Sequence, residues 1–422
     1  MEKSGKKVTH SVELMAPVGS FESLQAAINA GCDSVFFGIT QLNMRARAAN
    51  NFDFNDLAKI AKIAQKHKVR TYLTLNTLLY DHDMKLAYAI IDAVKANGID
   101  AIIVADMAAI AYANEIGVEV HISTQLSIAN VETVKYFAQL SDTIVLAREL
   151  TVPMIKHVCD EIKAQGITGR SGRPLEIEVF GHGAMCVAIS GRCGMSLLTD
   201  NSSANRGACR QNCRRSYKII DEQTNTQLKV ENDYVLSPED LCTVGLLDEL
   251  VDTGIAVLKI EGRGRSADYV DKVIRVYREA LDALNAGTYT QEKIVEWNKR
   301  LGTVYNRGMS GGFYLGKPFV AWSGAYGNRA TQKRELVGVV TNYFSKIGVV
   351  EVTAQENTIA NTDEYLITGE TTGVVRGTAP KLIIEEKEVE LAPKGSVVTF
   401  SISQKVRRGD RLYKVVTVNN GF

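Results

Sequence analysis

The sequence predicts an α/β fold in which a (β/α) barrel over residues 1–330 is followed by a small all-β barrel over residues 331–422. Two patterns support this prediction. From Val12 to about Lys259, short apolar runs alternate with amphipathic stretches, which is typical of parallel strands joined by helical crossovers. After Gly327 the apolar runs become short and alternating, with turn residues between them, as expected of an antiparallel sheet.

The first part contains eight strand-length apolar runs, most of them rich in β-branched residues. They begin at Val12, Ser34, Thr71, Ala101, Val118, Thr143, Glu176 and Val257. Helical periodicity fills the segments between them, for example 56–66, 84–96 and 266–284. Seven or eight such units favour a closed barrel over an open, doubly wound sheet. No GxGxxG follows the first strand, which weakens the alternative of a dinucleotide-binding sheet.

The last part shows alternating runs at 337–340, 348–352, 365–367, 381–384 and 396–402, separated by Gly, Asn and charged turns. No helical periodicity is present there. A small closed β-barrel is the architecture that such a pattern favours.

Composition excludes several classes of protein. The chain has 422 residues, 45% hydrophobic and 23% charged, with a net charge of +1, so overall charge predicts no particular partner. The first residues lack the apolar stretch of a signal peptide, and no apolar run approaches the roughly 20 residues that span a bilayer. We therefore expect a cytoplasmic protein without a membrane partner. Five of the seven cysteines fall between 186 and 242, which in a reducing compartment indicates metal binding or redox chemistry.

Polar residues follow most of the predicted strands, where a barrel places its chemistry. Several of them suit an anionic small molecule, because guanidinium and ammonium groups pair with carboxylate or phosphate. These candidates are Arg45, Arg47, Asn76, Gln125, Arg148, Lys259 and Arg263. His121 and His182 are candidate proton donors or acceptors, and Glu261 is a candidate base or the salt-bridge partner of its neighbours. Structural ion pairs at the barrel rim explain any single one of these residues equally well.

A longer motif runs from Glu178 to Ser196 and contains Glu-Val-Phe-Gly-His-Gly-Ala-Met-Cys, with a second cysteine seven positions after Cys186. It resembles the signature of the peptidase U32 family. Further family-like segments lie in the same order along the chain, at 14–20, 121–125, 205–214, 237–242 and 258–263. The resemblance covers roughly residues 12–330, and the β-rich tail is similar to the C-terminal domain of the family.

The resemblance implies two kinds of activity. The family name refers to collagenase-like proteolysis, whereas the better-understood relatives are oxygen-independent hydroxylases of a tRNA wobble uridine, a ribosomal RNA cytidine or a ubiquinone precursor. A barrel with a β-tail is most similar to the branch that hydroxylates tRNA uridine with prephenate as co-substrate. The leading hypothesis is therefore tRNA hydroxylation, with ribosomal RNA as an alternative substrate, a U32-type peptidase as the alternative activity, and no DNA partner.

The cysteines are expected to hold a [4Fe–4S] cluster, which takes four thiolates. From the resemblance, the ligands are Cys186, Cys193, Cys209 and Cys242. Cys213 is an alternative fourth ligand, since it follows Cys209 by one helical turn, and zinc is the alternative metal. The sequence contains no HExxH or GxSxG motif. A protease pairing of Cys186 with His182 would leave the other cysteines unexplained.

Residues 201–220, which include Cys209 and Cys213, contain five basic residues and no acidic residue. Four of them are candidates for contact with RNA phosphates, namely Arg206, Arg210, Arg214 and Arg215. A solvated loop, or cations that balance the charge of a metal cluster, would explain the same residues.

Overall fold

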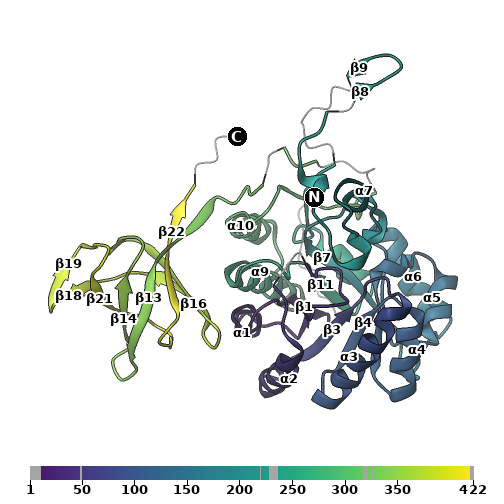
Figure 1. Cartoon of the computed structure of the whole chain (residues 1–422), viewed down its shortest axis with the longest axis horizontal. Coiled ribbons are helices and arrows are strands. Elements are labelled where there is room, and N and C mark those ends of the chain that lie inside the picture. Colours follow the sequence, from purple (N-terminus) through teal and green to yellow (C-terminus); the bar gives the residue numbers. More distant parts are fainter. Residues whose placement is uncertain are drawn as a thin grey trace.

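The computed structural model describes residues 11–47, 50–218, 220–227, 236–316, 322–324 and 327–418. Its first part is a closed barrel of eight parallel strands (Figure 1). The strands are β1 Glu13–Pro17, β2 Ser34–Phe37, β3 Arg70–Leu75, β4 Ala101–Val104, β5 Glu119–Ile122, β6 Thr143–Val145, β7 Glu176–Gly183 and β11 Val257–Ile260. The last strand, β11, pairs in parallel with both β1 and β7. This pairing closes the barrel and confirms the predicted α/β barrel over the open sheet.

Helices cover the outside of the barrel (Figure 1). They are α1 Phe21–Asn29, α2 Leu57–Lys66, α3 Met84–Asn97, α4 Met107–Ile116, α5 Val131–Ala138, α6 Val152–Ala164, α8 Leu247–Asp252, α9 Ala267–Ala286 and α10 Gln291–Leu301. Local sequence sets their ends. Ser20 and Ser23 form a capping box at the start of α1, and α3 ends at Gly98, which has a left-handed φ of 68°.

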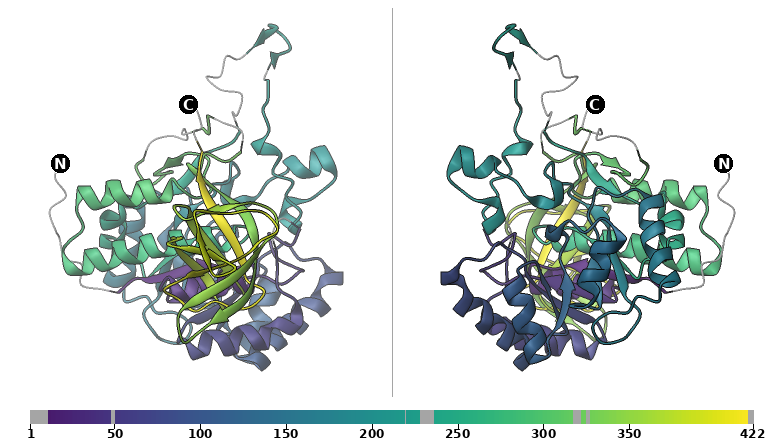
Figure 2. Two further views of the ribbon diagram at one scale, coloured as in Figure 1. Left: turned by 90° about the vertical axis from the view of Figure 1, so that its left-hand side faces the viewer. Right: turned by 90° about the vertical axis from the view of Figure 1, so that its right-hand side faces the viewer.

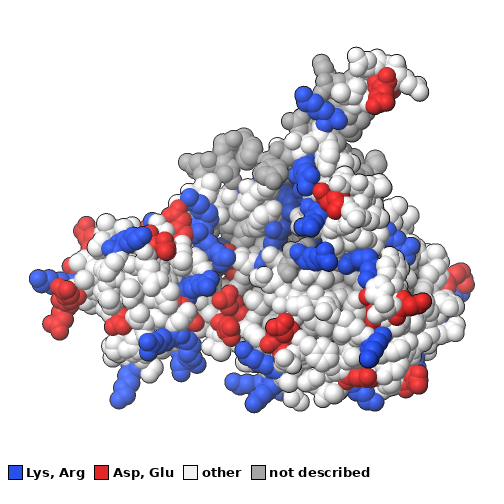
Figure 3. Space-filling view, in the orientation of Figure 1, with Lys and Arg blue, Asp and Glu red and all other residues white. Residues whose placement is uncertain are grey.

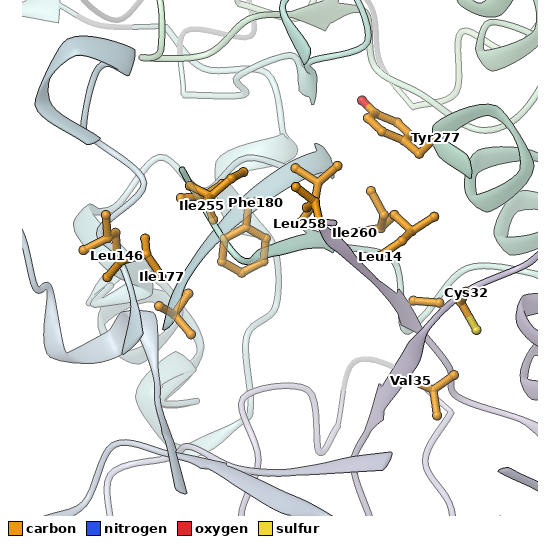
Figure 4. Packing of buried hydrophobic residues seen from close by; sticks show 14 of the residues in the cluster. Leu14, Cys32, Val35, Leu146, Ile177, Phe180, Ile255, Leu258, Ile260 and Tyr277 are labelled. Carbon is orange, nitrogen blue, oxygen red and sulfur yellow. The ribbon is translucent and has the colours of Figure 1, made fainter. Parts of the chain in front are cut away.

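The main core lies between the outer face of the barrel strands and these helices. Figure 4 shows Leu14, Leu258 and Ile260 packed side by side on β1 and β11, near Tyr277 of α9. Cys32 and Cys159, expected from sequence to be core residues, are both buried in this cluster. Burial of such apolar surface is the dominant favourable term in folding.

A long insertion between β7 and α8 contains the cysteine-rich segment. Its elements are α7 Met195–Asp200, β8 Ile220–Asp221, β9 Thr226–Gln227 and β10 Asp240–Cys242. The strand β10 pairs antiparallel with the end of β7 and parallel with β12 Met309–Ser310. These pairings hold the insertion at the C-terminal end of the barrel, and the β8–β9 hairpin projects away from it (Figures 1 and 2). Among the described residues, no helix is both long and apolar enough to cross a bilayer.

The second part is antiparallel and all-β, as predicted. Its strands are β13 Gln332–Phe344, β14 Val349–Ala354, β15 Ile359–Ala360, β16 Glu364–Gly369, β17 Gly373–Thr378, β18 Leu382–Ile384, β19 Lys387–Val389, β20 Leu391–Ala392, β21 Val397–Ser401 and β22 Arg411–Thr417. Eight of them form one sheet in the linear order β17-β16-β22-β13-β14-β21-β18-β19, while β15 pairs with β20. A separate core that includes Val337, Phe400 and Leu412 fills this domain.

The β domain docks on α1 and α9 through β16 and β17 (Figures 1 and 2). The side chain of Asn29 on α1 donates to the carbonyl of Thr372 at 3.0 Å. Arg334 of β13 forms an ion pair with Asp268 of α9 at 2.9 Å. At Gly373 the two backbones approach so closely that an added Cβ would lie 2.9 Å from the amide nitrogen of Ala26.

Replacing Gly373 by valine is therefore expected to weaken this docking. The residue has a φ of +70°, which costs a non-glycine residue about 1–2 kcal/mol, and the new side chain would also displace the α1 backbone. The matched control is Gly395→Val, because Gly395 also has a positive φ but faces open space. In thermal unfolding of the full chain, Gly373→Val should lower Tm more than Gly395→Val; equal shifts would show that the contact contributes nothing.

Candidate functional site

A cavity of about 310 Å³ opens at the C-terminal ends of the barrel strands, beneath the insertion. Asn76 after β3, Gln125 after β5, Arg148 after β6 and Glu261 after β11 all line it. Asn76 and Gln125 share a hydrogen bond of 3.2 Å between their amide groups. This is the face at which α/β barrels carry their chemistry, and all four residues were singled out from the sequence because they follow predicted barrel strands.

Positive charge dominates the lining of this cavity. Six arginines and one lysine face a single carboxylate, that of Glu261. The cations are Arg45, Arg148, Arg214, Lys259, Arg263, Arg265 and Arg307. Figure 3 shows Lys and Arg side chains gathered on the same part of the surface, below the projecting hairpin. Such an excess of buried and half-buried positive charge favours an anionic ligand.

Glu261 is held as an ion by its neighbours. Burial acts to raise its pKa, but Arg45, Arg148 and Arg263 outweigh burial and lower the pKa below its usual range. Its carboxylate lies 3.0 Å from the guanidinium of Arg45. Of its two predicted roles, the geometry therefore fits the salt-bridge partner better than the base, since a base with a lowered pKa takes up protons weakly.

Arg263 is a fixed part of the cavity wall. It is only 3% exposed, and its guanidinium donates to Thr74 Oγ1 and Asn43 Oδ1, both at 2.5 Å. Burial lowers its pKa to about 10. The chain needs glycine at position 38, because a Cβ there would lie 2.3 Å from Arg263 Nη1.

Arg148 has a buried nitrogen atom that could donate a hydrogen bond to a ligand. Its guanidinium stacks on the ring of Phe180 at 3.8 Å, and one amino group donates to the carbonyl of Ala184 at 3.4 Å. Its buried Nε atom has no hydrogen-bond partner among the described residues. A buried donor without a partner is costly, so this atom is well placed to be satisfied by a bound anion.

Lys259 forms the floor of the cavity. Its ammonium lies 2.8 Å from Glu178 Oε1 and 4.4 Å from the centre of the Phe36 ring. Arg47, by contrast, is exposed and does not line the cavity. Of the predicted anion-binding residues, Arg47 is therefore the one that the structure leaves outside.

The four cysteines that line the cavity are not the same four that the family resemblance implied as cluster ligands. Cys186, Cys193, Cys209 and Cys213 all line the cavity, whereas Cys242 does not. Cys242 lies on β10 opposite His182 of β7, and its sulfur lies 3.7 Å from Asn298 Oδ1 on α10. Cys242 packs in the core between the barrel and the helices, so the fourth cysteine that lines the cavity is Cys213.

Hydrogen bonds and neighbouring charges differ among the four thiols at the cavity. The sulfurs of Cys193 and Cys209 each accept a backbone N–H at 3.4 Å, from Met195 and Gln211 respectively, and such hydrogen bonds tune iron–sulfur centres. Burial, followed by the charges of the other three cysteines, raises the pKa of Cys213 against the lowering effect of Arg214. Within the described part of the chain, no three His, Cys, Asp or Glu side chains already form a metal-binding group. The chemistry of the donor set fits a [4Fe–4S] cluster, and the chain would hold it through Cys186, Cys193, Cys209 and Cys213.

Neither predicted histidine touches the cavity. His182 is buried with Nδ1 3.3 Å from the Tyr277 hydroxyl, and burial lowers its pKa to about 3, so it is neutral. It is not available as the base of a Cys186–His182 pair. His121 is also buried, inside the barrel and below the cavity floor.

The predicted RNA-binding arginines fall into two classes. Arg206 pairs with Asp83 and stacks over the ring of Tyr80 at 4.3 Å. Arg214 lies at the cavity wall and donates to Pro238 O at 2.7 Å and Ser237 Oγ at 3.0 Å. These two are committed to internal contacts. Arg210 and Arg215 are exposed, which leaves them available to a partner.

Sequence reasoning did not place Arg265, Tyr305 or Arg307 at the cavity, although all three line it. Arg265 stacks on the ring of Tyr305 at 3.5 Å, and Arg307 lies 3.3 Å from Asp240. Arg265 follows β11 by five residues, so the strand-end rule was sufficient to find it. Arg307 and Tyr305 reach the cavity because β12 pairs with β10, and this pairing leaves no signal in the sequence.

The family model described as Peptidase family U32 matches residues 19–324. The chain belongs to this family. A protein named collagenase from Porphyromonas gingivalis is 47% identical over 95% of this chain and 97% of its own length. The U32 relatives also include tRNA hydroxylation protein P1 of Bacillus subtilis, 33% identical over 86% of this chain and 84% of that protein. A 23S rRNA 5-hydroxycytidine synthase of Escherichia coli is 34% identical over 65% of this chain and 40% of that protein.

Proposed function

We propose that this U32 protein hydroxylates a uridine of tRNA without molecular oxygen, with a [4Fe–4S] cluster and prephenate as co-substrate. The observation that carries the proposal is the sharing of one cavity by four thiols and seven cations. Such a surplus of cations suits a dicarboxylate such as prephenate, because guanidinium and ammonium groups form strong charge-assisted hydrogen bonds with carboxylates, whereas peptide hydrolysis does not call for it. A bound cluster would supply electron transfer, and the relatives named as RNA hydroxylation proteins support an RNA substrate.

The chain's own residues would divide the work as follows. Arg148 and Lys259 bind the carboxylates of the co-substrate, while Arg45 and Glu261 fix the wall beside it. Arg210 and Arg215, exposed near the cavity, are placed to contact RNA phosphates. Cys186, Cys193, Cys209 and Cys213 hold the cluster at the same cavity.

The test is nucleoside mass spectrometry of bulk tRNA and ribosomal RNA from a strain that lacks the gene. A hydroxylated uridine should disappear from tRNA and return when the wild-type gene is restored. It should not return with Cys213→Ala, and it should return with Cys159→Ala, the matched change of a core cysteine. Loss of a hydroxylated cytidine from ribosomal RNA would assign the other substrate, and an unaltered nucleoside profile would refute the proposal.

A U32-type peptidase is the second candidate, favoured by the 47% identity to a protein named collagenase. It needs a base beside its nucleophile. His182 is buried outside the cavity that Cys186 lines. Hydrolysis of gelatin by the purified protein, lost in Cys186→Ser, would favour this activity.

Arg148→Met is expected to weaken binding of prephenate by about ten- to a hundredfold, because a hydrogen bond to a charged group contributes about 1.5–3 kcal/mol. Methionine keeps much of the apolar contact with Phe180. Arg170→Met is the control, since Arg170 is exposed, does not line the cavity, and its guanidinium donates to the carbonyl of Asn114. Calorimetric titration measures both affinities; unchanged affinity in Arg148→Met would remove this residue from the co-substrate site.

A further inference from the structure

A line of titratable side chains crosses the interior of the barrel below the cavity. It begins at Glu119, whose side chain is 34% exposed at the N-terminal end of β5. Its carboxylate lies 3.8 Å from His121 Nε2. On the other side of the ring, His121 Nδ1 lies 3.6 Å from Glu178 Oε2. The other oxygen of Glu178 lies 2.8 Å from the ammonium of Lys259 on the cavity floor.

The atoms in the middle of this line lack ordinary partners. Both ring nitrogens of His121 and the Oε2 atom of Glu178 are buried without a hydrogen bond among the described residues. Buried polar atoms are satisfied in nearly all structures. The two gaps of 3.6 and 3.8 Å are slightly longer than a hydrogen bond, so a small turn of the imidazole ring can close either one.

The surroundings of His121 favour a proton-carrying ring. Its neighbours from the other strands are Tyr72 on β3, whose ring centre lies 4.5 Å away, and Glu178 on β7. The hydroxyl of Tyr72 is already donated to Glu13. Burial acts to lower the pKa of His121, but Glu119 and Glu178 outweigh burial and raise it.

We propose that Glu119, His121, Glu178 and Lys259 form a proton path from solvent at the N-terminal face of the barrel to the floor of the cavity. Lys259 gives a proton to an oxygen of the bound anion and becomes a neutral amine. His121, as an imidazolium, passes its Nδ1 proton to Oε2 of the Glu178 carboxylate, and rotation of the resulting carboxyl group carries that proton to Lys259, which leaves Glu178 ionised again. The His121 ring then turns its bare nitrogen toward Glu119, which takes a proton from water and passes it to the ring. One proton enters the cavity for each taken from solvent, and every group returns to its starting charge.

The use of these protons in catalysis rests on the proposed hydroxylation, but the path itself is testable without it. His121 is 1% exposed, so its ring protons exchange slowly with water unless a path exists. The chain has six histidines; labelling them with ¹⁵N and comparing spectra with those of His121→Gln assigns the His121 ring signals. The key variant is Glu119→Gln, because an amide cannot pass a proton on and the residue lies at the half-exposed edge of the barrel.

Exchange of the His121 ring protons with solvent is expected to slow about tenfold or more in Glu119→Gln. Asp142→Asn is the matched control, since Asp142 pairs with the same Arg173 as Glu119 but lies outside the line. Equal exchange rates in wild type and Glu119→Gln would overturn the path. In the hydroxylation assay, Glu119→Gln should lower kcat and raise its solvent deuterium isotope effect, with KM for prephenate unchanged. Absence of hydroxylation by the wild-type protein would refute the proposed function, while the exchange rates would still decide the path.

Discussion

Replacing Cys213 by alanine is expected to abolish the visible iron–sulfur absorbance of the anaerobically purified protein and to remove its iron. The wild type should contain about four irons per chain, the number in a cluster with four thiolate ligands. Cys213 lines the cavity with Cys186, Cys193 and Cys209, so its loss would leave one iron without a protein ligand.

Cys242→Ala is the matched control for this experiment. This cysteine was the fourth ligand expected from the family resemblance, but its sulfur lies beside Asn298 outside the cavity. The variant should keep its absorbance and its iron. If Cys242→Ala lost iron and Cys213→Ala kept it, the assignment drawn from the structure would be wrong. Zinc in place of iron in the wild type would instead support a structural zinc site.

Replacing Lys259 by methionine is expected to lower the free energy of unfolding at pH 7 by about 3–5 kcal/mol, because it leaves the carboxylate of Glu178 buried without its counter-ion. The side chains of both residues are almost fully buried, at 5% and 0% exposure. Neutralising both in Lys259→Met with Glu178→Gln should recover much of the loss, since a buried pair often contributes little net stability. Denaturant titration gives the free energy of unfolding of the wild type, Lys259→Met and the double variant. Equal free energies for Lys259→Met and the wild type would contradict this account.

The effect of Lys259→Met should depend on pH in a defined direction. In the wild type Glu178 has a lowered pKa, since Lys259 and His121 outweigh the effect of burial. Its ionisation therefore stabilises the fold above its unfolded pKa of about 4.3, and this contribution is lost as pH falls through the lower folded value. In Lys259→Met, burial is expected to raise the pKa of Glu178 instead. The loss of unfolding free energy caused by the substitution should therefore grow as the pH rises above about 4.3. The two proteins should differ least in acid and most near neutrality.

The barrel could be predicted from the sequence because each strand is a short apolar run between amphipathic helices. Patterns of this kind depend only on nearby residues and indicate secondary structure directly. The strand-end rule found Arg45, Arg148 and Glu261 for the same reason. It failed for His121 and His182, because alternation along a strand decides whether a side chain faces the barrel interior, the helices or the cavity. The sequence could not show that Cys213 lines the cavity and Cys242 does not, since their positions depend on how the insertion folds onto the barrel through β10 and β7.

The docked β domain lies close to the pair of strands, β1 and β11, whose pairing closes the barrel. Helices α1 and α9 both pack against β1. This first barrel strand pairs with the last one, β11, and that pairing closes the barrel. The β domain packs on both helices through β16 and β17. It therefore links two helices that lie next to the closing pair of strands, β1 and β11. Residues 332–418 contribute nothing to the cavity lining, so we expect any effect of this domain on the cavity to pass through its contacts with α1 and α9. We therefore expect that this domain cannot be exchanged among family members unless α1 and α9 are exchanged with it.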